Sequence, residues 1–327
     1  MRVFVTGATG FVGQHLTRRL HDDGHDLVCL VRETACVDTA RSIGATLVRG
    51  NVGSVNELSE GMVGCDCVVH LANIYSLWEP DPSVYQEVNV DGTRHVMEAA
   101  LDTGVPKVVH VSTNLVWGRP EQIPYNETTE PGPVRFSAYA ESKFQGDLIA
   151  WRLYEERGLP LVVLYPGSIL GPGDEKFTGA LIRSLMGRQL PARMFDEASF
   201  TYVHVTDVVA AIVAVMESPI VIGERYLIGN RQMTMGDFYS TVCEFAGTAP
   251  PALRLPDVLV PPTAWCLTQI ADLIKSPPLW GLSTDAVRMA GTGTHSDGSK
   301  AERELGVLYT SLETALEETV AWVRDQE

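Results

Sequence analysis

The stretch that decides the fold of this chain reads Val3-Phe4-Val5-Thr6-Gly7-Ala8-Thr9-Gly10-Phe11-Val12-Gly13. A short apolar run predicts a buried strand, the regularly spaced glycines predict a turn, and residues 14–20 continue with a helical pattern. Gly7 permits the tight turn, Gly10 lets the backbone approach a pyrophosphate, and Gly13 lets the helix pack closely on the strand. The free N–H groups of the first helical turn also attract phosphate. The stretch therefore predicts a βαβ unit that binds a dinucleotide.

The first half of the chain alternates between short apolar segments and helical patterns. Valine-rich strands that are buried on both faces are typical of a parallel sheet with helices on both sides. The sequence therefore predicts an α/β protein with a Rossmann-type doubly wound parallel sheet. Further strands are expected at 27–31, 46–48, 67–71, 107–111 and 161–164, and helices at 84–101 and 137–157.

The pattern becomes irregular after Gly171. A helix at 205–217 and an apolar run at 226–228 are expected to rejoin the first domain, and an amphipathic helix is expected at 311–323. We therefore expect a Rossmann domain at 1–170, together with about 203–230. A smaller C-terminal substrate-binding domain is expected at 171–202 and 231–327.

The composition is that of an ordinary globular chain, with 327 residues and a formal net charge of −16. This charge argues against nucleic acid or an anionic membrane as the main partner. The cysteines show no zinc-type spacing, so no metal site is expected, and Cys29, Cys65 and Cys67 are expected to be buried in a reducing compartment. Because the first strand begins at Arg2, no signal peptide is expected, and we predict a cytoplasmic protein.

Residues 258–274 form the most apolar of the later stretches. Pro261, Pro262, Gln269 and Asp272 interrupt it, so it is too broken to span a bilayer. Two interpretations stay open, namely an amphipathic helix over a pocket and a helix in peripheral contact with a membrane.

Tyr139 and Lys143 lie four residues apart at the start of a predicted helix, so they share one helix face. A lysine beside a tyrosine favours the phenolate and lowers the pKa of the tyrosine, which gives a proton donor and acceptor near neutral pH. The strand at 107–111 is followed by Ser112 and Thr113, at the edge where parallel sheets bind ligands. A hydroxyl at that edge can hydrogen-bond a carbonyl oxygen as negative charge develops on it.

These features together resemble the extended short-chain dehydrogenases/reductases of the epimerase/dehydratase superfamily. The resemblance covers roughly the first two-thirds of the chain and rests on several motifs in the family's order. They are Thr6–Gly13, Val69-His70-Leu71-Ala72, Asn89-Val90-x-Gly92-Thr93, Val111-Ser112-Thr113 before Val116-Trp117-Gly118, Tyr139-x-x-x-Lys143, Pro166-Gly167-x-x-Leu170-Gly171-Pro172-Gly173 and Tyr202-Val203-His204-Val205-x-Asp207.

The resemblance implies a bound nicotinamide dinucleotide and a triad in which position assigns the hydroxyl to Thr113. It implies that Tyr139 exchanges the hydroxyl proton, while Lys143 lowers the pKa of the tyrosine and holds the nicotinamide ribose. A homodimer through the helices at 84–101 and 137–157 is also implied. The expected cofactor contacts are Gly7, Thr9, Gly10, Phe11, Val12, Gly13, Arg32, Asn51, Val52, Leu71, Ala72, Asn73, Val111, Tyr139, Lys143, Tyr165, Pro166, Gly167 and Ser168.

The end of the second strand indicates which dinucleotide is bound. An acidic residue at this position binds the ribose hydroxyls of NAD, but this chain has Val31 followed by Arg32. A cation suits a 2′-phosphate, so NADP is favoured over NAD, although Glu33 weakens the charge argument. Asn51 resembles the family's adenine-contacting acid changed to an amide, which can still hydrogen-bond adenine.

At two positions the chain departs from the family, and these departures limit which of the family's reactions it is expected to catalyse. The resemblance implies acidic residues at the first position in the family's sugar-nucleotide dehydratases, which use them for elimination. This chain has Asn114 and Leu115 there, so a 4,6-dehydratase is not expected. Phe200 stands where sugar-nucleotide epimerases usually hold the diphosphate with an arginine, for which Arg193 or Arg288 can substitute.

The loop at 73–78, which follows the fourth strand, favours an apolar substrate. The resemblance is then closest to the dihydroflavonol-reductase-like and hydroxysteroid-dehydrogenase-like branch. The expected substrate contacts are Tyr75, Trp78, Asn114, Phe136 and Phe200, and Met194, Phe195, Trp265 and Trp280 are further candidates.

We therefore expect an NADP(H)-dependent oxidoreductase that reduces a ketone or aldehyde, or oxidises the alcohol, of a fairly apolar small molecule. The first alternative is a nucleotide-sugar epimerase that oxidises its substrate transiently with bound NAD. The second is a non-catalytic dinucleotide sensor, which is disfavoured because such relatives usually lack the tyrosine or the lysine.

Overall fold

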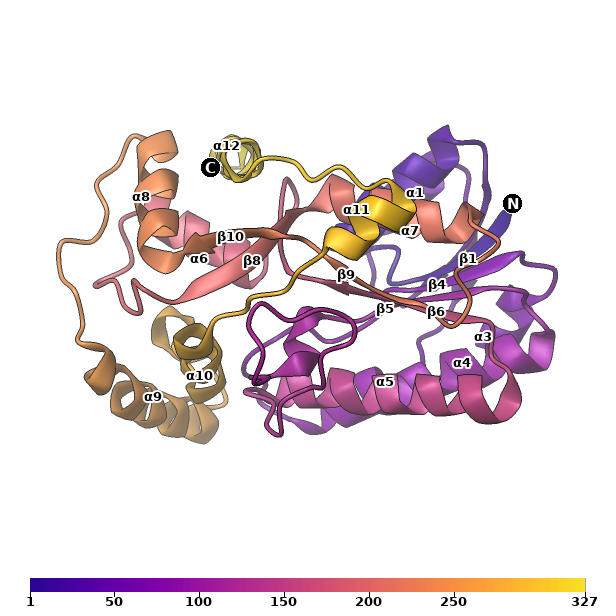
Figure 1. Cartoon of the computed structure of the whole chain (residues 1–327), viewed down its shortest axis with the longest axis horizontal. Helices are drawn as coiled ribbons and strands as arrows, with labels where there is room; N and C mark the ends of the chain where they lie inside the picture. Colours follow the sequence, from indigo (N-terminus) through magenta and orange to yellow (C-terminus); the bar gives the residue numbers. More distant parts are fainter. Residues whose placement is uncertain (327) are drawn as a thin grey trace.

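The computed structural model describes residues 1–326, which are organised around a seven-stranded sheet (Figure 1). Its strands lie in the order β3-β2-β1-β4-β5-β6-β9 and all run parallel. This order, with the first strand in the interior of the sheet, is the doubly wound arrangement and confirms the predicted fold class. The strands are β1 (Arg2–Thr6), β2 (Asp26–Val31), β3 (Thr46–Arg49), β4 (Cys67–His70), β5 (Val108–Val111), β6 (Leu161–Pro166) and β9 (Arg225–Ile228).

Helices cover both faces of this sheet (Figure 1). Successive side chains of a strand point to opposite faces, so Val5 packs with Leu16 in one hydrophobic core while Phe4 packs with Met97 in the other. The apolar run that opens the chain is therefore buried from both sides. The first face carries α1 (Phe11–Asp22), α2 (Asp38–Ser42), α7 (Val205–Glu217) and α11 (Ser299–Leu305), and the second carries α3 (Val55–Met62), α4 (Gly92–Thr103) and α5 (Ala138–Arg157). A π-helix, Tyr85–Asp91, leads into α4, and a 3-10 turn, Asn114–Trp117, follows β5.

The smaller lobe has a three-stranded sheet in the order β10-β8-β7 and a hydrophobic core of its own. The structure places β7 in this sheet and packs α11 against α7 and β9 of the main lobe. The chain thus passes between the lobes more often than the predicted domain limits imply, and residue 327 lies outside the described residues. The elements are β7 (Ser168–Leu170), α6 (Phe177–Met186), β8 (Ser199–His204), β10 (Arg231–Thr234), α8 (Met235–Ala246), α9 (Val260–Ile274), α10 (Thr284–Thr292), α12 (Leu312–Asp325) and the 3-10 turns Asp257–Leu259 and Leu279–Gly281.

The strand order reverses at β1, which pairs with both β2 and β4, and ligands bind at such a switch point. The side chain of Thr6 connects the two strand ends there. Its Oγ1 lies 2.7 Å from Nδ1 of His70 and accepts a hydrogen bond from the backbone of Ala72. The other ring nitrogen of His70 lies 3.1 Å from the hydroxyl of Thr93 on α4. His70 therefore joins α4 to the ends of β1 and β4.

Cys29, Cys65 and Cys67 are buried free thiols, as predicted. Within residues 1–326, none of the helices combines the length and the apolarity needed to cross a bilayer.

Candidate active site

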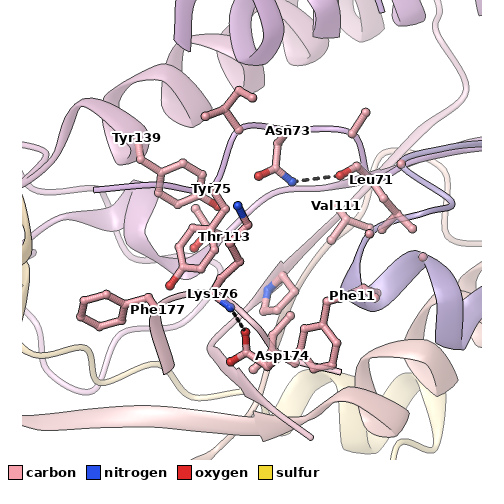
Figure 2. A pocket seen from close by; sticks show the side chains of 18 of the residues that line it. Phe11, Leu71, Asn73, Tyr75, Val111, Thr113, Tyr139, Asp174, Lys176 and Phe177 are labelled. Atoms are coloured by element: carbon pink, nitrogen blue, oxygen red, sulfur yellow. Dashed lines mark hydrogen bonds between the residues drawn. The ribbon is translucent and has the colours of Figure 1, made fainter. Parts of the chain in front are cut away.

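A cavity of about 1310 Å³ extends from the glycine turn into the smaller lobe. It is lined by all the predicted cofactor-binding residues except Lys143 and Tyr165. Figure 2 shows Tyr75, Thr113 and Tyr139 close together on one side of it, with Phe11 of the glycine turn facing them across the space. The carboxyl ends of β1, β2, β4 and β5 supply most of the cofactor half, and the smaller lobe supplies the rest of the wall.

The glycine turn fits a dinucleotide because its backbone is too crowded for side chains. Gly7 has φ +75°, and a Cβ built on it would lie 2.7 Å from the backbone nitrogen of Ala72. A Cβ on Gly13 would lie 2.8 Å from Cα of Ala8 and would collide with the carbonyl oxygen of Gly7. Gly10, in contrast, faces the cavity with extended backbone. The turn therefore presents bare backbone and the N-terminus of α1 to the place where a pyrophosphate binds.

The adenosine end of the cavity lies at the ends of β2 and β3. Arg32 and Asn51 both line it. The guanidinium of Arg49 donates a hydrogen bond to the carbonyl oxygen of Arg32 (3.1 Å), so two cations neighbour this end. The side-chain oxygen of Asn51 already accepts from the backbone of Gly53 (2.7 Å). The NH₂ group of Asn51 is thus the part that can reach an adenine ring.

Thr113 and Tyr139 lie together at the cavity wall, and Lys143 lies one helical turn after Tyr139. Thr113 follows β5, its hydroxyl accepts from the backbone of Leu115 (3.3 Å), and its side chain is hydrogen-bonded to that of Tyr139. Ser137 caps the N-terminus of α5 and so fixes where Tyr139 begins its first turn. Lys143, one turn later, is buried and donates to the carbonyl oxygen of Val111 (3.0 Å). Thr113 and Tyr139 line the cavity, and Lys143 lies behind them.

The pKa values in this cluster differ from the expectation that Lys143 lowers the pKa of Tyr139. Burial raises the pKa of Tyr139, and the hydrogen bond from Thr113 opposes this only in part. Burial lowers the pKa of Lys143 to about 8, against the attraction of Asp147. The expected depression of the tyrosine pKa by Lys143 is absent: burial dominates the pKa of Tyr139, and the ammonium of Lys143 is directed to the carbonyl oxygen of Val111. Burial therefore favours the protonated, neutral form of Tyr139.

Asp147 is a functional candidate that the sequence reasoning missed. It follows Lys143 by one helical turn, and its carboxylate accepts from the hydroxyl of Ser112 (2.8 Å) and lies 3.0 Å from Nε2 of His110. Burial raises the pKa of Asp147 to about 7, against the attraction of Lys143. Ser112 thus supports the buried carboxylate, while its neighbour Thr113 faces the cavity. Only the i, i+4 spacing from Lys143 points to Asp147 in the sequence.

The start of the loop after β4 is clamped by the side chain of Asn89. Asn89 accepts a hydrogen bond from the backbone of Ile74 (2.7 Å) and donates to its carbonyl oxygen (3.1 Å). This clamp sets the ring of Tyr75 against that of Tyr139, with centroids 5.0 Å apart. Asn73 donates to the carbonyl oxygen of Leu71 and leaves its buried Oδ1 without a partner in the described structure. That oxygen is free for a ligand.

The substrate half of the cavity is mainly apolar and aromatic. Phe200 lines it, as predicted, with Tyr75 and Asn114. Neither Arg193 nor Arg288 substitutes for the missing arginine, because Arg193 pairs with Asp196 away from the cavity and Arg288 is exposed outside it. The other apolar and aromatic lining residues, which the sequence reasoning missed, are Leu115, Phe177, Leu181, Tyr202, Met235, Phe238, Met289 and Trp322.

Several expected substrate contacts lie elsewhere. The indole of Trp78 turns away from the cavity and donates to Asp272 of α9 (2.9 Å). Phe136 lies against a separate small pocket beside Gly118. Tyr165, an expected cofactor contact, is buried in the core between the sheet and α5, where its hydroxyl accepts from the indole of Trp151. Two further candidates, Met194 and Phe195, pack against α9, and the other two, Trp265 and Trp280, are exposed on the outer surface.

The fold and this cavity are those of a dinucleotide-binding protein of the doubly wound class. A family model described as "NAD dependent epimerase/dehydratase family" matches residues 3–229. The chain therefore belongs to the NAD-dependent epimerase/dehydratase family, the extended short-chain dehydrogenases/reductases. Membership supports a nicotinamide dinucleotide as the cofactor.

Two curated relatives match nearly the whole chain. A "Putative dihydroflavonol 4-reductase" of Synechocystis sp. is 28% identical over 98% of this chain and 94% of its own length. "Sterol demethylase protein B" of Methylococcus capsulatus is 29% identical over 100% of this chain and 99% of its own length.

Solved structures share the fold throughout. The one described as "Crystal structure of gox2253" superposes with a TM-score of 0.84 at 31% identity, covering 99% of this chain and 98% of that one. UDP-glucuronic acid 4-epimerase from Bacillus cereus in complex with NAD superposes with a TM-score of 0.79 at 22% identity, covering 100% and 99%. The second likeness shows the fold alone.

Proposed function

We propose that this protein is an NADP(H)-dependent carbonyl reductase that acts on a ketone or aldehyde group of a bulky apolar molecule, or oxidises the corresponding alcohol. The observation that carries the proposal is the wall of the substrate half. Phe200 and its apolar neighbours adjoin Tyr139, and no arginine of residues 1–326 lines this half. Although Lys176 also lines the cavity beside Phe177, a wall that is mostly apolar disfavours a nucleotide diphosphate and favours apolar surface.

Each residue of the site has a separate role in the reduction of a carbonyl group. A bound nicotinamide dinucleotide supplies or accepts a hydride at the substrate carbon. The hydroxyl of Tyr139, protonated at neutral pH, donates its proton to the substrate oxygen, and the hydroxyl of Thr113 hydrogen-bonds that oxygen. The ammonium of Lys143 stabilises the phenolate that remains after the proton has left. Tyr75 excludes water from one side of Tyr139.

The choice of NADP rests on charge at the adenosine end. Arg32 lines the cavity, Arg49 is hydrogen-bonded to its backbone, and Val31 stands where NAD-binding chains place an acid. A guanidinium binds a 2′-phosphate through charge-assisted hydrogen bonds that NAD does not offer. A preference for NADPH over NADH is the expected result.

The names of the relatives favour a bulky apolar substrate. One is described as a dihydroflavonol reductase and another as a sterol demethylase protein, and both kinds of molecule are polycyclic. Rings of this size need the wide aromatic wall that Phe177, Phe200 and Phe238 provide. A homodimer through α4 and α5 remains a prediction.

The test is a spectrophotometric screen of NADPH and NADH against apolar ketones, aldehydes and secondary alcohols. We expect NADPH oxidation with bulky ketones, and the rate with Tyr139→Phe should fall by about a thousandfold while cofactor binding is retained. Thr113→Val serves as a second variant and should lower kcat with little change in cofactor affinity. No turnover of any of these compounds, together with epimerisation of a UDP- or GDP-sugar by protein carrying tightly bound NAD, contradicts the proposal.

A further inference from the structure

The outer surface around α9 is unusually apolar for a region that lines no cavity. Half of the large hydrophobic side chains that are exposed in residues 1–326 lie between 253 and 280, each at least 50% exposed. We call this set the α9 face. Its members are Leu253, Val258, Leu259, Trp265, Ile270, Leu273, Ile274, Leu279 and Trp280.

The helix is apolar on both its sides. Val260, Ala264 and Ala271 face inward, and the first two pack with Val287 of α10. Trp265 and Leu273 project from the opposite side, 58% and 83% exposed. A helix that is apolar all round is normally buried. No residue of α9 lines the cavity, so the interpretation of 258–274 as a helix over the pocket is wrong.

The charged groups of this region are few and balance one another. Residues 253–280 contain two basic and two acidic side chains, so the region is formally neutral in a chain of net charge −16. Each of the four has a partner outside the α9 face, although all four side chains are exposed and only Arg254 pairs with an opposite charge. The contacts are Arg254 to Asp196 (3.5 Å), Asp257 from the backbone of Phe195 (3.0 Å), Asp272 from the indole of Trp78 (2.9 Å) and Lys275 to the carbonyl oxygen of Pro80 (3.0 Å).

We propose that the α9 face docks on a zwitterionic lipid surface. A neutral, apolar patch with two exposed tryptophans suits the boundary between headgroups and acyl chains. Charge separates this partner from an anionic membrane, because anionic lipid repels a chain of net charge −16, whereas a zwitterionic lipid does not.

The position of the face links it to the cavity. α9 packs against α10 (Figure 1), and Met289 of α10 lines the substrate half. A protein seated on lipid through α9 thus holds its apolar cavity beside the layer in which an apolar ketone dissolves. This link rests on the proposed function, but the docking does not.

The test is flotation of the full-length protein with phosphatidylcholine vesicles. The variant is Leu273→Glu, and the control is Leu308→Glu, because Leu308 is also a leucine, is 87% exposed, and lies outside the α9 face. Wild type and the control should float equally, and Leu273→Glu should lower the partition coefficient by about tenfold or more. Binding should be insensitive to added NaCl, since no charge carries it.

Three results overturn the docking proposal. One is no flotation of the wild type, and another is flotation that is unchanged in Leu273→Glu. The third is a dimer, seen by light scattering, that Leu273→Glu converts to monomer without vesicle binding. NADPH oxidation by the wild type is measured in parallel with a water-dispersed ketone and no vesicles. If the wild type shows no such activity, that result counts against the proposed function alone.

Discussion

An alanine substitution in the glycine turn can reduce cofactor binding without reducing the stability of the fold. Gly10 has φ −82° and ψ 176°, a conformation that alanine adopts without strain. A Cβ at this position would have one neighbour within 4 Å, the carbonyl oxygen of Gly7 at 3.3 Å. We therefore expect Gly10→Ala to change the free energy of unfolding by less than about 1 kcal/mol. The same methyl would occupy the space that a pyrophosphate needs, at a cost of about 1–3 kcal/mol in binding, or about 5- to 150-fold in Kd.

Gly13→Ala is the matched variant in which folding should suffer. Its Cβ would lie 2.8 and 2.9 Å from two backbone atoms of Ala8, so the turn and α1 must move apart. Overpacking of this kind costs about 1–3 kcal/mol. For 327 residues the entropy of unfolding is about 0.7 kcal/mol/K, so Tm should fall by about 1.5–4 °C. Cofactor affinity should fall as well, because the turn is displaced.

The assay pairs thermal unfolding by circular dichroism with titration of NADPH and NADH by isothermal calorimetry. Gly10→Ala should keep the wild-type Tm within about 2 °C and lose affinity for both cofactors. A Gly10→Ala protein that binds both as tightly as wild type would refute the placement of the pyrophosphate at this turn. If Gly10→Ala lowers Tm as much as Gly13→Ala does, the argument that Gly10 serves cofactor binding and Gly13 serves packing would be refuted.

Three further predictions concern charge and stability. Arg32→Ala should weaken NADPH binding by about tenfold and NADH binding by less than about twofold, and equal losses in calorimetry would sink the NADP assignment. Asp147→Asn removes the attraction that opposes the lowering of the Lys143 pKa, which stands at about 8. The alkaline fall of kcat should then begin at lower pH, and an unchanged pH profile counts against this coupling. Asp207→Ala deletes the acceptor of two 2.8 Å hydrogen bonds from the backbone and hydroxyl of Thr310, so urea unfolding should show a loss of about 2–4 kcal/mol, and a wild-type midpoint contradicts it.

Local pattern was enough to predict the sheet and the cofactor half. Each strand there is a short apolar run, each connection is a helix, and right-handed crossovers leave few ways to assemble them. The glycine turn, Arg32 and Thr113 follow directly after strands, so sequence position alone places them at one edge of the sheet. No contact between distant segments had to be known for these predictions.

The substrate wall depends on such distant contacts and was predicted only in part. Met289 and Trp322 come from α10 and α12, and nothing near them in sequence marks a cavity. Within the loop after β4, the clamp by Asn89 turns Tyr75 inward, whereas a carboxylate nearly two hundred residues away draws the indole of Trp78 outward. Alternation along a short loop cannot distinguish these two aromatic side chains before the fold is known.

The charge state of the triad shows why proximity alone was an insufficient guide. Spacing on α5 places Lys143 near Tyr139, but the energy of a charge depends on the water that it loses as much as on its neighbours. Both groups are buried, so the neutral forms of both gain: the pKa of the tyrosine rises and that of the lysine falls. A phenol that stays protonated at neutral pH is ready to donate, and a carbonyl oxygen that receives a hydride at its carbon needs a proton. The buried site, as the chain alone builds it, is therefore better prepared for reduction of a carbonyl than for removal of a proton from an alcohol.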